Sequence, residues 1–122
     1  MSITKTYAVI CTKDLERAKG WYSKLFGRQP DLTPMAEVHE WYFGNGGIQL
    51  LDDAERSGQS RLTLIIDDMD EIRRGLGERG LRLGEASGGD FATVAQITDL
   101  DGNVVTFAEP GPKAKEMNKG LR

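Results

Sequence analysis

The residues best suited to chemistry in this chain are few. His39 is the only histidine and Cys11 the only cysteine. His39 is therefore the only imidazole that could act as a base for the Cys11 thiol. No histidine neighbours Cys11 in sequence, which favours a small buried residue over an activated nucleophile. Acids gather at Asp67, Asp68, Asp70 and Glu71. They lack the oxygen spacing of a calcium loop and are typical of a helix N-terminus, where the helix dipole favours negative charge.

The composition indicates a globular protein with one domain. The chain has 122 residues, of which 39% are hydrophobic and 29% charged. A net charge of −3 and the lack of a basic run argue against a nucleic-acid partner. The N-terminus lacks the apolar stretch of a signal peptide, and no segment approaches the ~18 apolar residues of a membrane span. A lone cysteine excludes an internal disulfide, so we expect a cytoplasmic protein with no membrane partner.

The elements that must position the chemical groups follow local signals. β-Branched and aromatic residues predict a strand over 6–12. Asp14 is a good N-cap, and apolar side chains follow it at helical spacing until Gly27 ends the helix. The rest of the first half predicts a weaker extended stretch at 29–35 and strands at 38–43 and 48–51. The first half therefore has the order β-α-β-β-β.

The same order returns after a polar linker at 52–60. Asp68, with Glu71 three residues later, predicts the start of a second helix, and Gly80 ends it. Strands are predicted at 62–66, weakly at 81–86, and at 91–98 and 103–108. Two copies of one unit predict an α+β fold of two tandem β-α-β-β-β modules, about 5–52 and about 60–109. Each module has one helix for one sheet face, so its other face needs a partner or forms a concavity.

The end of the chain differs from the two modules. Residues 1–110 read as a single domain, and residues 111–122 as a polar, basic C-terminal tail. We expect this tail to be loose, or at most to form one or two docked helical turns.

Two stretches resemble the vicinal oxygen chelate superfamily, which includes glyoxalase I, extradiol dioxygenases and bleomycin resistance proteins. "KDLERAKGWYSKLFG" at 13–27 is close to the first helix of that family, and "DLDGNVVTFAEP" at 99–110 is close to its final hairpin. The resemblance covers about residues 5–109. It implies strands that curl into an open, incomplete β-barrel around a cavity, usually in a homodimer.

The resemblance also locates a metal site, which this chain lacks the residues to form. Family enzymes hold a divalent metal with His, Gln or Glu at four places, which correspond here to Tyr7, Gln49, Arg61 and Thr106. A divalent cation needs lone pairs from imidazole, carboxylate, amide or thiolate groups. Arginine has no acceptor, and threonine and tyrosine hydroxyls are poor ligands unless ionised. Gln49 alone could coordinate, so the resemblance implies a member with neither the metal nor another cofactor.

The same positions could instead bind a small organic ligand. The expected ligand-binding residues are Tyr7, Trp41, Gln49, Arg61, Thr63 and Thr106. A guanidinium binds carboxylate or phosphate bidentately, so Arg61 suggests an anionic group; alternatively it pairs with an acid such as Glu40 or lies in water. Trp41 and Phe43 share one strand face and Glu40 and Tyr42 the other, and one pair should face the cavity as an aromatic wall.

Three functions remain open at this point. The first is a metal-independent small-molecule binding protein, as in the bleomycin-resistance branch. The second is an enzyme: a metal-dependent lyase or dioxygenase is disfavoured, but a metal-free isomerase or epimerase could use Tyr7 or Glu40 as acid or base. The third is a regulatory module that binds a partner through the basic tail from Lys113 to Arg122. We expect the first.

Overall fold

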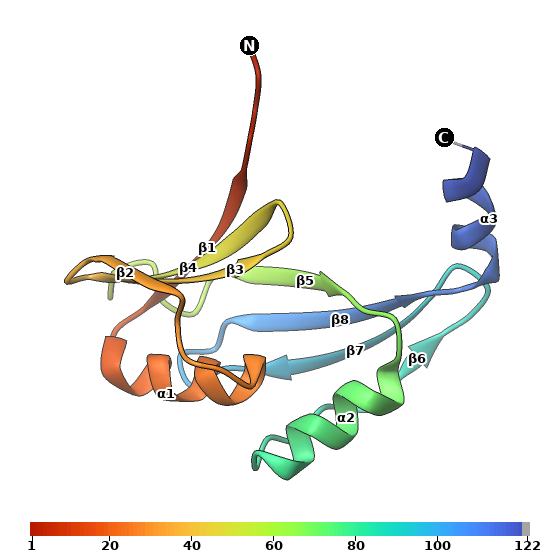
Figure 1. Ribbon diagram of the computed structural model, residues 1–122. Coiled ribbons are helices and arrows are strands. Elements are labelled where there is room, and N and C mark those ends of the chain that lie inside the picture. Colours follow the sequence, from red (N-terminus) through yellow and green to blue (C-terminus); the bar gives the residue numbers. More distant parts are fainter. Residues whose placement is uncertain (121–122) are drawn as a thin grey trace. The chain divides into compact units, whose positions relative to one another are not determined.

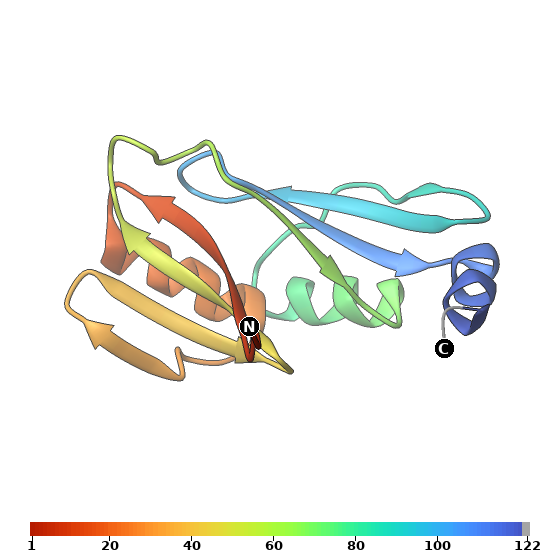
Figure 2. The same cartoon turned by 90° about the horizontal axis from the view of Figure 1, so that it is seen from above.

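The computed structural model describes residues 1–120 of the chain, with side chains as far as residue 116. Its contacts divide the chain into two compact units. The first unit holds residues 1–61 and 98–104, and the second holds residues 62–97 and those from 105 onward. Each unit contains one four-stranded sheet (Figure 1, and from above in Figure 2). The architecture is α+β, as the sequence predicts.

The first unit has the predicted β-α-β-β-β order. Its strands and helix are β1 (Thr6–Thr12), α1 (Leu15–Phe26), β2 (Leu32–Met35), β3 (Val38–Phe43) and β4 (Gly46–Asp52). In the sheet they stand in the order β1-β4-β3-β2. β1 runs parallel to β4 and β3 runs antiparallel to it, because α1 crosses over between β1 and the three strands that follow.

Local signals explain where α1 begins and ends. The Asp14 carboxylate accepts a hydrogen bond from the Arg17 amide at 3.2 Å, which satisfies one of the free donors of the first turn. Gly27 adopts a φ of 72° and ends the helix, since the left-handed conformation suits a residue without a Cβ. Both ends agree with the prediction from the sequence.

The core of the first unit lies between α1 and the sheet. Trp41 is fully buried on β3, and its ring centroid lies 6.4 Å from that of Tyr22 and 5.3 Å from that of Phe26 on α1. The indole N–H donates to the Arg28 carbonyl at 3.0 Å, so its polar atom is satisfied. The face of the sheet that carries Trp41 is therefore the face that α1 covers, and the opposite face has no helix from this unit.

The "DLDGN" turn, residues 99–103, links distant parts of the first unit through hydrogen bonds, and we call it the clasp. The buried Asp99 carboxylate accepts hydrogen bonds from the amides of Asp101 and Asn103, from the Asn103 side chain and from the Tyr22 hydroxyl. Asn103 in turn donates to the Cys11 carbonyl on β1 and accepts from the Ser60 amide. Residues far apart in sequence are thus joined through one turn, which explains its polar composition.

The second unit repeats the order. Its elements are β5 (Arg61–Ile65), α2 (Met69–Glu78), β6 (Ser87–Gly88), β7 (Ala92–Thr98), β8 (Val104–Pro110) and α3 (Pro112–Gly120), and the sheet order is β5-β8-β7-β6. Asp68 caps α2 by accepting from the amides of Asp70 and Glu71. The acidic cluster therefore serves the helix start, as predicted. Among the described residues, no helix has the length and apolar character needed to cross a membrane.

The strand predicted at 81–86 is absent from the structure. Residues 81–86 form no strand; the short strand β6 lies at Ser87–Gly88, and the Gly84 amide donates to the Gln96 carbonyl. Glycines weaken strands because they offer no side chain for packing.

The C-terminal segment forms the helix α3, whereas the sequence predicted a loose tail or at most one or two docked helical turns. The amides of Gly111 and Lys113 donate to the carbonyls of Phe91 and Asp90, which anchors the start of α3, and Ala114 is buried. These are contacts between distant residues, so no local signal indicated them. Residues 121–122 of the predicted tail lie outside the described residues.

Candidate functional site

The face of the first sheet opposite α1 carries a group of polar and aromatic side chains, which we call the open face. Residues paired across neighbouring strands share a face, so the register decides which side chains meet. Val9 pairs with Gln49, which pairs with Glu40. Tyr7 pairs with Gly47, which pairs with Tyr42. The open face therefore contains Tyr7, Val9, Glu40, Tyr42 and Gln49.

Gly47 allows the two tyrosines of the open face to approach each other. A Cβ at this position would lie 2.9 Å from Cε1 of Tyr7 and 2.8 Å from the Trp41 carbonyl oxygen. Without it, the Tyr7 ring lies across the backbone of β4, and its centroid is 6.3 Å from that of Tyr42. Glycine is required here because a side chain on β4 would separate Tyr7 on β1 from Tyr42 on β3.

Glu40 is the charged centre of the open face. It is only 6% exposed, and both oxygens of its carboxylate accept hydrogen bonds. The Tyr42 hydroxyl donates to Oε1 at 2.9 Å, and the Gln49 amide donates to Oε2 at 2.6 Å. These bonds hold the carboxylate in one orientation, since each oxygen has a fixed donor. The pairing of Glu40 with Arg61 that the sequence left open does not occur.

The bond to Glu40 also changes the chemistry of Tyr42. Donation to the carboxylate, together with burial and the negative charge of Glu40, raises the pKa of Tyr42 to about 12. The phenol therefore stays protonated at neutral pH and remains a donor. It is not suited to act as a general base.

A cation lies on the aromatic part of the open face. The Lys5 ammonium is 4.2 Å from the centroid of the Tyr42 ring and 5.7 Å from that of Tyr7. These distances are typical of cation–π contacts, in which the negative face of the ring attracts the positive charge. The two rings thus form a surface that accepts an ammonium group.

Trp41 lies on the other face of the sheet, and this corrects its assignment to the ligand-binding set. Strand alternation places its neighbours Glu40 and Tyr42 on the open face and Trp41 against α1. The sequence did not decide which face of β3 packs against a helix. In the structure, α1 covers the face with Trp41 and Phe43. Tyr22 and Phe26 of α1 hold this indole in the core because large apolar surface is most stable there.

The remaining predicted site residues lie on β5 and β8. Arg61 and Thr63 are exposed on β5, at the first and third positions of the strand. Thr106 is half-buried on β8, and its hydroxyl accepts a 3.0 Å hydrogen bond from the Gln96 amide of β7. In both sheets, therefore, the third strand and the last strand of a β-α-β-β-β unit are joined by one glutamine hydrogen bond.

The residues at the family's four metal positions do not fit a divalent metal. Gln49 and Thr106 are engaged in hydrogen bonds to Glu40 and Gln96, and Arg61 supplies a positive charge and no lone pair. Over the residues that the structure describes, no three His, Cys, Asp or Glu side chains gather as a metal-binding group. We therefore derive no chemical step through a metal ion.

Neither His39 nor Cys11 is placed to act as a reactive group. His39 lies on the α1 side of β3, where Nδ1 is 2.8 Å from the Thr33 hydroxyl, and burial lowers its pKa, with a smaller effect of Lys19. Cys11 is buried, and burial followed by the charge of Asp53 raises the pKa of its thiol. A raised pKa reduces the thiolate fraction, as expected for an unreactive cysteine.

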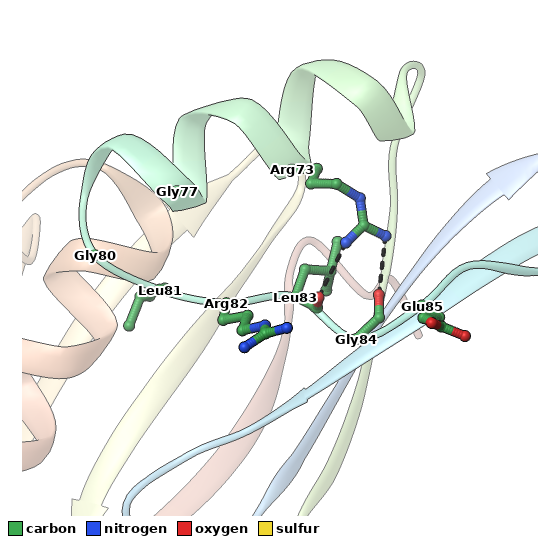
Figure 3. A pocket seen from close by; sticks show the side chains of 8 residues that line it. All are labelled: Arg73, Gly77, Gly80, Leu81, Arg82, Leu83, Gly84 and Glu85. Carbon is green, nitrogen blue, oxygen red and sulfur yellow. Dashed lines mark hydrogen bonds between the residues drawn. The ribbon is translucent and has the colours of Figure 1, made fainter.

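A separate cavity of about 600 Å³ lies beside the end of α2 in the second unit. Figure 3 shows the Arg73 guanidinium, which donates to the carbonyls of Leu83 and Gly84 at 2.9 and 2.8 Å. The arginine is thereby used to hold the extended segment after the helix. None of the predicted site residues lines this cavity, whose lining consists of Arg73, Gly77, Gly80, Leu81, Arg82, Leu83, Gly84 and Glu85.

The residues predicted from the sequence to bind a ligand include neither Tyr42 nor Glu40, although this pair was one of the two that could face the cavity. The available signal was strand alternation, which places both residues on the face opposite Trp41. The sequence could not decide which face α1 covers, because that depends on packing between elements.

The structure resembles solved proteins of one family. A glyoxalase/bleomycin resistance protein from Catenulispora acidiphila is 25% identical, with a TM-score of 0.79 over 84% of this chain and 95% of that one. This chain has the fold of the vicinal oxygen chelate superfamily. An antibiotic-binding protein from Streptomyces is 24% identical, with a TM-score of 0.73 over 86% and 93% of the two chains. A lactoylglutathione lyase from Agrobacterium tumefaciens is 20% identical, with a TM-score of 0.70 over 85% and 91%.

No model of a known protein family matches the sequence, and no curated protein matches it either. The superfamily contains both binding proteins and enzymes, as these structures illustrate. Its fold alone therefore does not assign an activity to this chain. The residues on the open face must carry that assignment.

Proposed function

We propose that this chain is a metal-independent binding protein for a small organic molecule, with the open face of the first sheet as its principal binding surface. The observation that carries the proposal is the arrangement of Glu40, Gln49 and Tyr42. A glutamine at a metal-ligand position of the superfamily here donates to a carboxylate instead. Fixed hydrogen-bonding groups beside aromatic rings are typical of small-molecule sites.

The similarity to an antibiotic-binding protein supports a binding role, although it does not identify the ligand. For the second sheet, taken by itself, we propose Arg61, Thr63 and Thr106 as ligand contacts on β5 and β8. Arg61 has a fork of donors suited to carboxylate or phosphate groups. We also propose a homodimer, for which a mass of two chains in light scattering is the expected result and a monomer would contradict it.

An enzyme would use Glu40 as a base, and the hydrogen bonds argue against this. Both oxygens of its carboxylate already accept hydrogen bonds, from Tyr42 and Gln49, so a substrate would have to displace one of these donors to reach it. The lyase-type neighbour supports the enzymatic alternative only at the level of fold.

The test is to purify the protein from its host without dialysis and to analyse it by native mass spectrometry together with metal analysis. We expect a small organic molecule bound to the folded protein, released on unfolding, and no stoichiometric zinc, nickel, manganese or iron. A stoichiometric divalent metal would overturn the metal-independent proposal. A Glu40→Gln variant that fails to retain the organic molecule, with unchanged folding by circular dichroism, would assign its binding to the open face.

A further inference from the structure

The Glu40 carboxylate is a buried charge whose two hydrogen-bond donors are both neutral. It is 6% exposed, and its two recorded donors, Tyr42 and Gln49, are neutral. The ion pairs at Arg28–Asp31 and Arg56–Asp53 do not include it. Buried charges are usually both hydrogen-bonded and paired with an opposite charge. The ammonium group of a ligand, placed against this carboxylate, would therefore supply the opposite charge of an ion pair.

The two tyrosines already hold a positive group on the face of the sheet that carries this carboxylate. The Lys5 ammonium contacts the ring of Tyr42 at 4.2 Å, while the hydroxyl of the same side chain donates to Glu40. The Tyr7 ring lies 5.7 Å from the same ammonium. One side chain thus joins an aromatic cation surface to a negative charge, which is the combination that recognises ammonium groups.

Lys5 can leave this position at little cost to the fold. It is exposed and precedes the first residue of β1, so no ladder hydrogen bond of the sheet depends on its backbone. A flexible side chain outside the strand is a weak competitor for a ligand that brings the same charge.

We propose that the open face binds the ammonium group of an organic cation between Tyr7, Tyr42 and Glu40, and that Lys5 occupies this position when the cation is absent. This inference rests on the proposed function and names the ligand class for that site. It differs from the anionic ligand that Arg61 suggested, because Arg61 belongs to β5 whereas these groups lie on β1 and β3.

Three probes of the same shape test the charge. Choline carries a trimethylammonium group, 3,3-dimethylbutan-1-ol is its uncharged isostere, and 3,3-dimethylbutyrate is a related anion. Each is titrated into protein with 13C-labelled tyrosine and followed by NMR. The chain has three tyrosines, of which Tyr22 is buried beside Asp99 and serves as an internal control. We expect choline to shift the signals of Tyr7 and Tyr42 and to leave that of Tyr22 unchanged.

Two variants test the roles of the charged residues. Lys5→Met removes the competing ammonium and should tighten choline binding roughly fivefold, the size expected of an exposed cation–π contact. Lys13→Met, at the other end of β1, changes the net charge equally and should leave choline binding unchanged. Glu40→Gln should weaken choline binding by about tenfold because it removes the negative charge. The Lys5 variant lies on the surface, so it keeps the test valid if the Glu40 variant does not fold.

Three results would overturn the inference. One is binding of 3,3-dimethylbutan-1-ol or 3,3-dimethylbutyrate that equals or exceeds that of choline. Another is choline-induced shifts that spare Tyr7 and Tyr42. The third is a Lys5→Met variant that binds choline no better than the Lys13→Met variant does.

The outcomes distinguish this inference from the proposed function. If an organic molecule co-purifies on the open face but only the anion probe competes with it, the binding function stands and the ammonium assignment fails. If choline binds as expected but the purified protein carries a stoichiometric divalent metal, the ammonium site stands and the metal-independent function fails.

Discussion

The Gln49 amide donates a 2.6 Å hydrogen bond to the Glu40 carboxylate, from β4 to β3 of the first sheet. The second sheet has a counterpart in the 3.0 Å bond from Gln96 on β7 to Thr106 on β8. Equivalent pairs of strands are thus joined by a glutamine bond in both units, but the glutamine is on the last strand of the first unit and on the third strand of the second. The acceptor is a buried charge in the first unit and a neutral hydroxyl in the second. The two bonds should differ in what they contribute.

Replacement of the two glutamines compares these contributions directly. Gln49→Leu leaves one oxygen of the buried Glu40 without its donor and should lower the free energy of unfolding by about 2 kcal/mol. Gln96→Leu, at an exposed site with a neutral partner, should change it by less than about 0.5 kcal/mol. Urea unfolding of both variants measures the difference. Equal effects would mean that the charge on Glu40 does not strengthen the first bond.

Asp99→Asn tests the clasp formed by the "DLDGN" turn. The carboxylate accepts four hydrogen bonds, and an amide of the same size would turn its NH2 group toward donors. We expect a loss of about 3 kcal/mol in unfolding free energy. Asp52→Asn, at an exposed carboxylate at the end of β4, should stay within about 0.5 kcal/mol of the parent protein. An Asn variant at Asp99 as stable as this control would show that the clasp does not support the fold.

Alkaline pH should destabilise the protein through its tyrosines. Burial and the hydrogen bond to Asp99 raise the pKa of Tyr22 far above its ordinary value of 10.0, and the bond to Glu40 raises that of Tyr42 to about 12. A raised pKa in the folded state means that the unfolded chain loses its proton first. The stabilisation is therefore complete below pH 10.0 and declines as the pH rises above it.

Urea unfolding across this pH range measures the effect. Tyr22→Phe should lower stability at neutral pH and flatten the decline above pH 10.0, whereas Tyr42→Phe should remove only the part that ends near pH 12. An unchanged alkaline slope in the Tyr22→Phe variant would contradict the assignment.

Two glycines near α1 should respond to alanine with opposite signs. Gly20 lies within the helix with open space around its Cβ position, so Gly20→Ala should stabilise the protein by about 0.7 kcal/mol. Gly27 has a φ of 72°, and Gly27→Ala should destabilise it by about 1 kcal/mol because a Cβ is strained there. Thermal unfolding of each variant reports the direction. A stabilised Gly27→Ala would show that the helix end does not need the left-handed conformation.

Elements with strong local signals agreed with the sequence, as did the weaker stretch at 29–35, which contains β2, but two other weakly predicted segments did not. The ends of α1 were predictable because Asp14 and Gly27 act on their own neighbours in the chain. The strand predicted at 81–86 was wrong, and α3 was underestimated, because both depend on hydrogen bonds to residues distant in sequence.

The site shows the same division. Strand alternation correctly separated Trp41 from Glu40 and Tyr42, but it could not tell which side faced the helix. Packing of Tyr22 and Phe26 against Trp41 made that choice, and so placed Glu40 on the open face.

The sequence by itself determined the repeated β-α-β-β-β order, the capped helices and the absence of suitable ligands at the four metal positions. The first two follow from residue types and local spacing, whereas the four metal positions are those that the resemblance to the superfamily implies. Only the tertiary structure decided the register that brings Gln49 to Glu40 and Lys5 to Tyr42, because strand pairing and burial join residues that are separate along the chain.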